Sequence, residues 1–381
     1  MPPLSAPPEL VSAIEEELAS TRGSASDDSR ALGRLFRLFT SERGGLGKRS
    51  YLDDPALRRA YLRYHLPLNA ARASYVLAEA LRIEPSIAAL EEVVDLGAGP
   101  GSASLTSLLG LPATPARGYT LLDRSRSALA IGRRLVERCA ASRGGSTPAS
   151  SGLREVRTAA SSLVPLPAFP RRALVWLSFV LNEIGVGARR GNDPAGFLRA
   201  LARRLDPGSA VLLLEPALRA PARNLLAVHD AAAASGDWRV LAPCTHQRSC
   251  PLLRARDRSW CHFRFEWQPP DVALEAARPL GLGRDPPAVA YLVLLRREAR
   301  APVSSSAARV IGDPMRVRGG KTAVYICRDG SRELLEDPPP GADRGAVIEV
   351  EAPLPAVPAP GRDPGSTRSG RNRPRSPRSR G

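Results

Sequence analysis

Apolar residues recur in two kinds of pattern along this chain. In the first 85 residues they follow helical spacing, from Leu10 to Leu18 and again from Asp53 to Leu81. Beyond that point, short apolar blocks alternate with helical runs, and the blocks lie at residues 93–96, 118–123, 173–180 and 210–215. Strands that alternate with helices indicate parallel pairing through crossover helices. We therefore expect an α/β fold, with an N-terminal helical region at residues 1–85 and a Rossmann-like core at residues 86–300.

The chain changes character after the core. Residues 301–352 contain the strand candidates Val310–Ile311, Met315–Arg318 and Thr322–Cys327, separated by glycine-containing turns. Residues 353–381 are rich in Pro, Gly, Ser and Arg, with no apolar residue from Arg368 onward that could anchor the segment. We expect a small β-rich C-terminal region followed by a disordered Arg/Pro-rich tail.

The strongest local signal is Val93-Val94-Asp95-Leu96-Gly97-Ala98-Gly99-Pro100-Gly101-Ser102. Three glycines at alternate positions follow an acid at a strand end, so the chain can turn tightly and a ligand can approach its backbone. The spacing G-x-G-x-G differs from the dinucleotide fingerprint and resembles motif I of the class I methyltransferases, which bind S-adenosylmethionine (SAM). An ordinary strand-to-helix turn is the alternative. The cofactor-binding candidates in this segment are Asp95, Gly97, Gly99 and Gly101.

Further polar residues follow the later strands. Asp123 ends a strand about twenty residues past the glycines, where a carboxylate can accept hydrogen bonds from ribose hydroxyls. Its alternative role is to cap the helix that follows. Asn182 and Glu183 follow the next strand block and are our catalytic candidates, although they could merely cap the strand end or bind the cofactor. Parallel strands would bring Gly97, Asp123, Asn182 and Glu215 to one edge of the sheet.

Three of the five cysteines, Cys244, Cys250 and Cys261, lie in one loop at residues 243–263. Three soft ligands suggest a metal centre whose fourth ligand comes from elsewhere, and Cys327 is the natural candidate. Zinc and an iron–sulfur cluster are both compatible with thiolates, although the absence of a C-x-x-C pair counts against structural zinc. Buried thiols without a metal are the alternative. His246 and His262 could replace Cys327 or donate hydrogen bonds to cluster sulfur.

The composition indicates an acidic macromolecular partner. The formal net charge is +17, and nearly all of it comes from arginine. A GC-rich genome would also enrich arginine, but the resulting electrostatic field still favours RNA or DNA as the partner.

The sequence has no secretory signal and no run of about eighteen apolar residues, so we expect no membrane span. A cytoplasmic, monomeric protein is the expectation.

Taken together, these residues resemble the methyltransferase-like family of small-subunit ribosome assembly factors, which comprises the mitochondrial methyltransferase-like protein 17 and its bacterial relatives. The resemblance covers about residues 50–330 and rests on Tyr61–Pro67, Asp95–Gly101, Ser178–Glu183, Glu215–Pro216, Ala242–Cys244, Cys250–Pro251 and Trp260–Phe263. It implies a SAM-binding protein that acts on the small ribosomal subunit (rRNA) in ribosome assembly and translation. It also implies a 4Fe-4S cluster with the ligands Cys244, Cys250, Cys261 and Cys327.

Two functions remain open on the sequence. The first, which we favour, is SAM-dependent methylation of rRNA. The second is a catalytically inactive RNA-binding assembly factor with a structural iron–sulfur or zinc site. Amino-nitrogen methyltransferases typically carry an Asn/Asp-Pro-Pro-aromatic motif after the fourth strand, whereas this chain has Leu181-Asn182-Glu183-Ile184. A radical-SAM enzyme is disfavoured because the chain lacks a C-x-x-x-C-x-x-C run.

Overall fold

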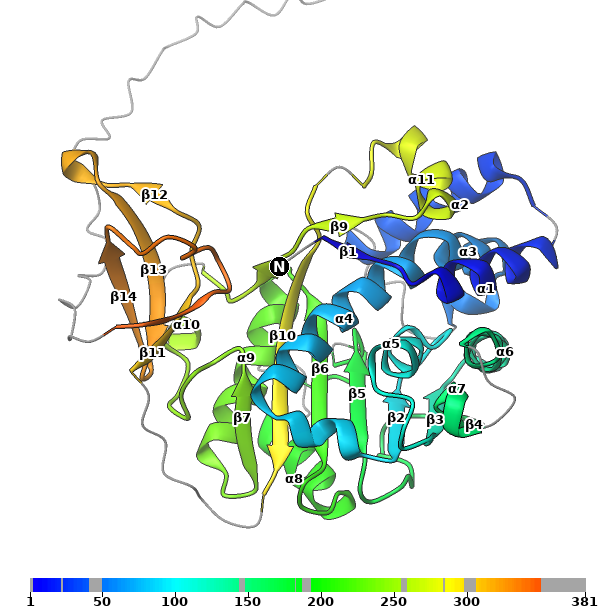
Figure 1. The fold of residues 1–381 in the computed structure, drawn as a ribbon, viewed down its shortest axis with the longest axis horizontal. Coiled ribbons are helices and arrows are strands. Elements are labelled where there is room, and N and C mark those ends of the chain that lie inside the picture. The colour runs from blue at the N-terminus through cyan, green and yellow to red at the C-terminus, as the bar shows by residue number, and fades with distance from the viewer. Residues whose placement is uncertain are drawn as a thin grey trace, which may run out of the picture.

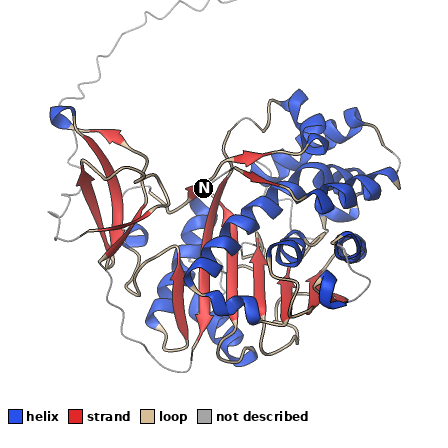
Figure 2. Ribbon diagram, in the orientation of Figure 1, coloured by secondary structure: helices blue, strands red, loops and turns tan. Residues whose placement is uncertain are grey.

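The structure is a computed structural model that describes residues 3–21, 23–40, 50–143, 148–181, 183–186, 193–254, 259–283, 285–297 and 306–350. The predicted tail at residues 353–381 and the first residues of the predicted C-terminal region lie outside these ranges. The described chain forms an N-terminal helical layer, a central sheet with helices on both faces, and a smaller C-terminal sheet (Figures 1 and 2).

The central sheet has the strand order β4-β3-β2-β5-β6-β10-β7, and β8 pairs with β10. Its strands are β2 (Glu92–Leu96), β3 (Arg117–Asp123), β4 (Leu153–Ala160), β5 (Leu174–Ser178), β6 (Ala210–Pro216), β7 (Trp238–Ala242), β8 (Phe263–Arg264) and β10 (Ala288–Arg296). Strands β2 to β6 pair in parallel, whereas β10 runs antiparallel between β6 and β7. The order reverses between β2 and β5, which is where ligands bind in doubly wound sheets. This is a methyltransferase-like Rossmann fold.

Helices cover both faces of this sheet. The helices are α1 (Pro8–Ala19), α2 (Ala25–Thr40), α3 (Pro55–Ala60), α4 (Leu66–Ile83), α5 (Ser102–Gly110), α6 (Arg126–Ser142), α7 (Pro148–Ser151), α8 (Pro194–Arg204), α9 (Arg219–Ala234), α10 (Pro251–Arg254) and α11 (Asp271–Ala277). Shorter turns of helix are η2 (Tyr51–Asp53), η3 (Tyr61–His65), η4 (Pro85–Ala89), η5 (Arg278–Leu280) and η6 (Arg318–Gly320). None of the helices in the described ranges is both long and apolar enough to span a membrane.

The strands bury both of their faces. Val93 and Trp176 pack with α1 to α6 on one face, whereas Val94 and Val175 pack with α8 and α9 on the other. Successive strand residues point to opposite faces, so a strand covered on both sides must be apolar throughout. This explains why the strands β2, β3, β5 and β6 were predictable as continuous apolar runs. The edge strand β4 was missed because most of its side chains are exposed.

The C-terminal sheet contains β11 (Ala307–Val310), β12 (Met315–Arg316), β13 (Thr322–Arg328), β14 (Ser331–Glu336) and β15 (Val347–Glu349). Its order is β12-β13-β11-β15, with β14 beside β13. Near the N-terminus, β1 (Leu4–Ser5) pairs in parallel with β9 (Trp267–Gln268), so the first residues of the described chain lie beside a segment far along the sequence.

Arg309 joins the C-terminal sheet to the rest of the molecule. Its guanidinium donates to the carbonyl oxygens of Pro243 (2.7 Å) and Gly345 (2.6 Å) and forms an ion pair with Glu79 on α4. Only 3% of Arg309 is exposed. The β-rich region and the cysteine loop are therefore held together by a buried charge.

Candidate functional site

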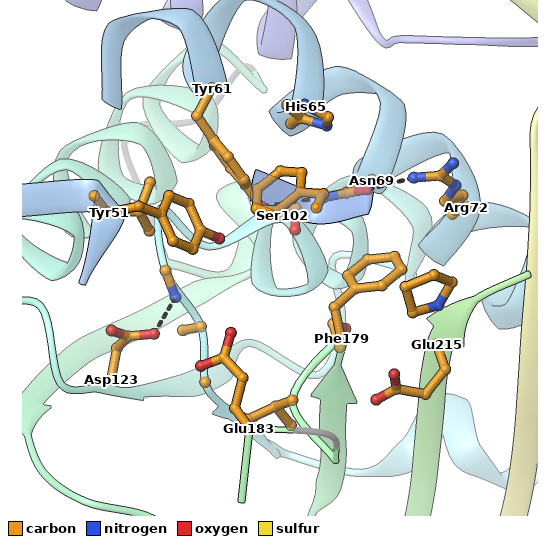
Figure 3. Close-up of a pocket in the computed structure, with 18 of the residues that line it drawn as sticks. Tyr51, Tyr61, His65, Asn69, Arg72, Ser102, Asp123, Phe179, Glu183 and Glu215 are labelled. Atoms are coloured by element: carbon orange, nitrogen blue, oxygen red, sulfur yellow. Dashed lines mark hydrogen bonds between the residues drawn. The ribbon is translucent and has the colours of Figure 1, made fainter. Parts of the chain in front are cut away.

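A cavity of about 440 Å³ lies at the carboxyl ends of β2, β3, β5 and β6 and is called the sheet-edge cavity below (Figure 3). The sequence-predicted residues Gly97, Gly99, Asp123, Glu183 and Glu215 line it together. Each comes from the end of a strand or the turn after it, because parallel strands deliver their last residues to the same edge.

The glycine turn forms the floor of the sheet-edge cavity and requires glycine for steric reasons. Gly97 and Gly99 have φ values of 80° and 52°. A Cβ atom on Gly97 would lie 2.8 Å from Cγ2 of Val180. Gly101 does not line the cavity; its φ is 86°, and a Cβ there would lie 3.3 Å from Cδ2 of Leu121 on β3. The first two glycines therefore open the backbone to a ligand, and the third serves packing.

Asp123 faces the sheet-edge cavity at the end of β3. Its Oδ2 accepts the backbone N–H of Gly99 (2.9 Å), and its Oδ1 accepts the backbone N–H of Ser125 (2.8 Å). The residue that caps α6 is Ser125, whose hydroxyl oxygen accepts the N–H of Ala128 at 3.2 Å. Asp123 is therefore not the helix cap, and its remaining lone pairs are available to a ligand.

Asp95 lies beneath the glycine turn and is absent from the cavity lining. Its Oδ2 accepts both the N–H (3.1 Å) and the hydroxyl (2.9 Å) of Ser104 on α5. Only 1% of the residue is exposed, and its burial raises the pKa of the carboxyl to about 7. The structure thus gives Asp95 a local role in holding the start of α5.

The structure describes only one of the two catalytic candidates. Asn182 lies outside the described residues. Glu183 lines the cavity, with its Oε2 3.6 Å from Nη2 of Arg124, and burial raises the pKa of its carboxyl. Glu215, on β6, accepts the backbone N–H of Leu181 at 3.0 Å. Glu215 therefore holds the loop after β5 as well as facing the cavity.

The N-terminal helices supply a wall of aromatic side chains that sequence reasoning missed. Phe39 lies 5.2 Å from Tyr51 and 5.0 Å from His65, measured between ring centroids. Burial lowers the pKa of His65 to about 3, so this imidazole is neutral at physiological pH. The run Tyr61–Pro67, which contributes to the family resemblance, was the only sequence signal for this wall. Aromatic residues in an amphipathic helix otherwise indicate packing in the core.

Asn69 and Arg72 also line the sheet-edge cavity, one turn apart on α4. Asn69 donates to the hydroxyl of Tyr61 (3.0 Å) and accepts from Nη1 of Arg72 (2.9 Å). No sequence pattern pointed to either residue, since polar residues three apart on a helix are also common on solvated faces.

The four cysteines of the predicted metal centre converge on a second, smaller cavity, called the cysteine cavity below. Cys244, Cys250, Cys261 and Cys327 all line it, together with Arg309. Cys139 lies apart on α6, where its thiol donates to the carbonyl oxygen of Glu9 (3.5 Å). Burial raises the pKa of all four cavity thiols, that of Cys261 to about 12. Without a metal these groups are neutral thiols.

The geometry does not by itself support the predicted metal loop. Within the ranges that the structure describes, no group of three or more His, Cys, Asp and Glu side chains is placed to hold a metal ion. His246 contacts a cysteine directly, with Nε2 3.3 Å from Sγ of Cys327. Its Nδ1 accepts the backbone N–H of Arg248 (3.1 Å), so the proton of the neutral ring is on Nε2 and points at the sulfur. His262 instead lies 3.2 Å from the carbonyl oxygen of Trp260.

Among solved structures, the chain is similar to several methyltransferases at low identity. These include an O-methyltransferase from Bacillus cereus in complex with SAH, at 10% identity over 70% of this chain and 90% of that chain, with a TM-score of 0.33. They also include TrmN from Thermus thermophilus, at 20% identity over 62% and 53% of the two chains, with a TM-score of 0.32. The ribosomal protein L11 methylase from Lactobacillus delbrueckii matches at 12% identity over 59% and 80%, with a TM-score of 0.32. The fold assignment rests on the strand order and not on these distant likenesses.

No curated protein matches the chain. A family described as mitochondrial small ribosomal subunit Rsm22 matches residues 57–335. The description names a mitochondrial component, so the expected cytoplasmic location is not confirmed. The match confirms the predicted resemblance to methyltransferase-like proteins of the small ribosomal subunit. Because it spans well over half of the sequence, the chain belongs to the Rsm22 family.

Proposed function

We propose that this protein binds SAM in the sheet-edge cavity and methylates rRNA of the small ribosomal subunit. The observation that carries the proposal is the meeting of the Gly97–Gly99 turn with the Asp123 carboxylate at the point where the strand order reverses. A bare backbone turn beside a strand-end acid suits a ligand with a ribose and no phosphate. SAM has both properties, and when bound it supplies a methyl group on a positively charged sulfur.

The residues divide the work of binding. Gly97 and Gly99 leave room for the cofactor to lie against the backbone, and Asp123 accepts hydrogen bonds from the ribose hydroxyls. The aromatic wall of Phe39, Tyr51 and His65 offers flat surfaces on which a base can stack. A base in a folded RNA must leave its stack before a buried site can reach it.

The reaction requires that the base and SAM are held in line and that one residue accepts a proton. Bound SAM would supply a methyl group to a nucleophilic atom of the base. Glu183, on the cavity wall, would accept the proton that this atom loses. Asn182, its neighbour in the chain, is the second proposed catalytic residue. Fixing the two reactants in line supplies most of the remaining acceleration.

Two observations support rRNA as the proposed substrate, the Rsm22 family and the net charge of the chain. The name of the Rsm22 family refers to the small ribosomal subunit. A formal net charge of +17 favours a polyanion as the partner. Ribosomal RNA of the assembling subunit meets both conditions.

One observation favours a second candidate, a catalytically inactive assembly factor. The segment after β5 reads Leu181-Asn182-Glu183-Ile184, whereas enzymes that methylate amino nitrogens carry Asn/Asp-Pro-Pro-aromatic at that place. In this alternative the cavity holds SAM as a structural ligand, and the protein acts by binding RNA.

The test uses anaerobically purified protein, tritiated SAM and small-subunit particles from a strain that lacks the gene. Gly99→Arg should abolish labelling, because the side chain would enter the cavity from a residue with φ of 52°. Gly236→Arg is the matched control, since a Cβ on this exposed glycine has nothing within 4 Å. Label that enters RNA with wild type and the control alone supports the enzyme. No label from any of the three, with binding to the particle retained, supports the inactive factor.

We further propose that the cysteine cavity holds a 4Fe-4S cluster. Four thiols from separate segments line one cavity, and the buried guanidinium of Arg309, which is paired with Glu79, lies beside them. A single zinc ion needs all four sulfurs at about 2.3 Å from one point, whereas a cluster spreads its ligands more widely. The sequence has no C-x-x-C pair, which is the spacing typical of structural zinc sites, and this favours the cluster over zinc.

A cluster would link the cysteine loop to β13 and stabilise the folded state, because a site absent from the unfolded chain adds its binding energy to folding. The test is the iron and sulfide content of anaerobically purified variants. Cys250→Ser and Cys327→Ser should lose iron and the visible absorption of the cluster. Cys139→Ser, on α6, is the matched control and should retain both. Wild-type protein that binds zinc in place of iron would overturn the proposal.

A further inference from the structure

Arg72 is a half-buried cation in the sheet-edge cavity, and no acid of the described chain forms an ion pair with it. Two arginines line the cavity, and the other, Arg124, forms an ion pair with Glu183. Arg72 donates only to neutral oxygens, from Nη1 to Oδ1 of Asn69 (2.9 Å) and from Nε to the carbonyl oxygen of Ala288 (3.2 Å). A buried charge without a counter-ion is costly and is retained where a ligand supplies the counter-ion.

The guanidinium is held in a fixed orientation. The contacts to Asn69 and Ala288 come from two different elements, α4 and β10. Asn69 is itself fixed by its bond to Tyr61. Because a guanidinium has five N–H donors, these contacts leave Nη2 without an acceptor among the described residues. The burial that holds the group also lowers the pKa of Arg72 to about 10, so it remains charged at neutral pH.

Phe179 adds an independent sign of a functional site. This residue follows β5 with a φ of 64°, which is strained for a bulky side chain. Its ring lies under the guanidinium of Arg72, with 5.7 Å between Cζ and the ring centroid. Strain of this kind is kept where the position of the side chain matters.

The position of Arg72 in the cavity corresponds to the amino-acid end of the proposed cofactor. Arg72 and Asp123 lie on opposite sides of the cavity (Figure 3), and the glycine turn lies beside Asp123. If Asp123 takes the ribose, the amino-acid part of the cofactor extends away from it. That part ends in a carboxylate, and a guanidinium binds a carboxylate through paired N–H donors.

We propose that Arg72 binds the carboxylate of the amino-acid part of SAM and thereby distinguishes SAM from nucleosides that lack it. The proposal rests on the proposed function, because it takes SAM as the ligand. It makes Arg72 a specificity-determining residue, and Phe179 and Asn69 the residues that position it.

Calorimetry with two ligands tests the proposal. The ligands are SAM and 5′-methylthioadenosine, which shares the adenosine and the sulfur but lacks the amino-acid part. Arg72→Met should weaken SAM binding by about 10- to 100-fold, as expected for a hydrogen bond between charged groups, and leave methylthioadenosine binding unchanged. Arg72→Lys keeps the charge and should lose less. Arg82→Met, on the exposed side of the same helix, is the matched control and should bind both ligands as wild type does.

Each other outcome overturns the proposal in a recognisable way. Equal loss of both ligands in Arg72→Met would show a structural role, because a disturbed cavity would weaken the binding of the adenosine part that the two ligands share. Unchanged SAM affinity with weakened RNA binding would assign Arg72 to a phosphate of the substrate. A wild-type protein that binds neither ligand would overturn the proposed function itself, and this subsite with it.

Discussion

The carboxylate of Asp123 accepts the backbone N–H of Gly99 with a nitrogen–oxygen distance of 2.9 Å. This bond ties the end of β3 to the turn after β2, two segments that would face the same cofactor. The acid is therefore part of the turn as well as a candidate ligand for the ribose. Its two roles can be separated by substitution.

We expect Asp123→Ala to lower SAM affinity by at least about 10-fold and to loosen the turn, because it removes the charged acceptor of both bonds. Asp123→Asn keeps an oxygen for one of the two N–H groups, turns its NH2 toward the other, and loses the charge. Its melting temperature should fall less than that of Asp123→Ala, while its SAM affinity falls. Calorimetry and thermal melts distinguish the two effects, and wild-type affinity in both variants would contradict the ribose role.

Gly97→Ala should destabilise the fold by about 1–3 kcal/mol, from the strain of a left-handed residue and from overpacking. The new Cβ would lie 2.8 Å from Cγ2 of Val180. Val180→Ala in the same chain should recover part of the loss, because it removes the clash and leaves the strain. Urea denaturation measures each free energy of unfolding. Gly236→Ala, in open space, should change it by no more than about 0.5 kcal/mol.

The buried carboxyl of Asp95 should make the free energy of unfolding depend on pH. Its pKa is about 7 in the folded chain, against 3.8 as the ordinary value. Because the folded state holds the proton more tightly, this contribution is fully present below about pH 4 and is lost as the pH rises to 7. Asp95→Asn cannot titrate, so the stability of wild type relative to this variant should fall over that window. A constant difference from pH 4 to 8 would contradict the assignment.

Loss of the buried cation of Arg309 should be strongly destabilising. Arg309→Met leaves the carbonyl oxygens of Pro243 and Gly345 without this donor, and it leaves Glu79 with only its exposed partner Arg82. Breaking a buried ion pair in this way costs about 3–5 kcal/mol. Arg171→Met is the control, because the ion pair of Arg171 with Asp206 is exposed and should contribute less than about 1 kcal/mol. Similar urea midpoints for the two variants would show that the buried contacts of Arg309 do not stabilise the fold.

His246 should tune the proposed cluster without ligating it. His246→Phe removes the N–H that points at Sγ of Cys327. The variant should keep its iron, and its reduction potential should become more negative, because hydrogen bonds to sulfur favour the more negative reduced state. Anaerobic redox titration measures the change. His262→Phe, whose ring faces a backbone oxygen, should leave the potential unchanged. Iron loss in His246→Phe as severe as in Cys327→Ser would instead make His246 a ligand.

Local patterns were sufficient for much of the central sheet. β2, β3, β5 and β6 were predictable because a strand buried on both faces is a continuous apolar run. The insertion of β10 between β6 and β7 was not predictable, because strand order depends on contacts between distant segments. The edge strand β4 exposes most of its side chains and so carries no apolar pattern.

The sequence by itself determined the glycine turn and Asp123, because a turn geometry and a strand end are set by a few adjacent residues. It also predicted which four cysteines lie together. Only the tertiary structure decided that Asp95 bonds to Ser104 and lies outside the cavity, and that Arg72 and Phe179 face each other inside it. The direction of a side chain depends on the packing of its whole element. That packing brings together residues more than a hundred positions apart, which no local pattern records.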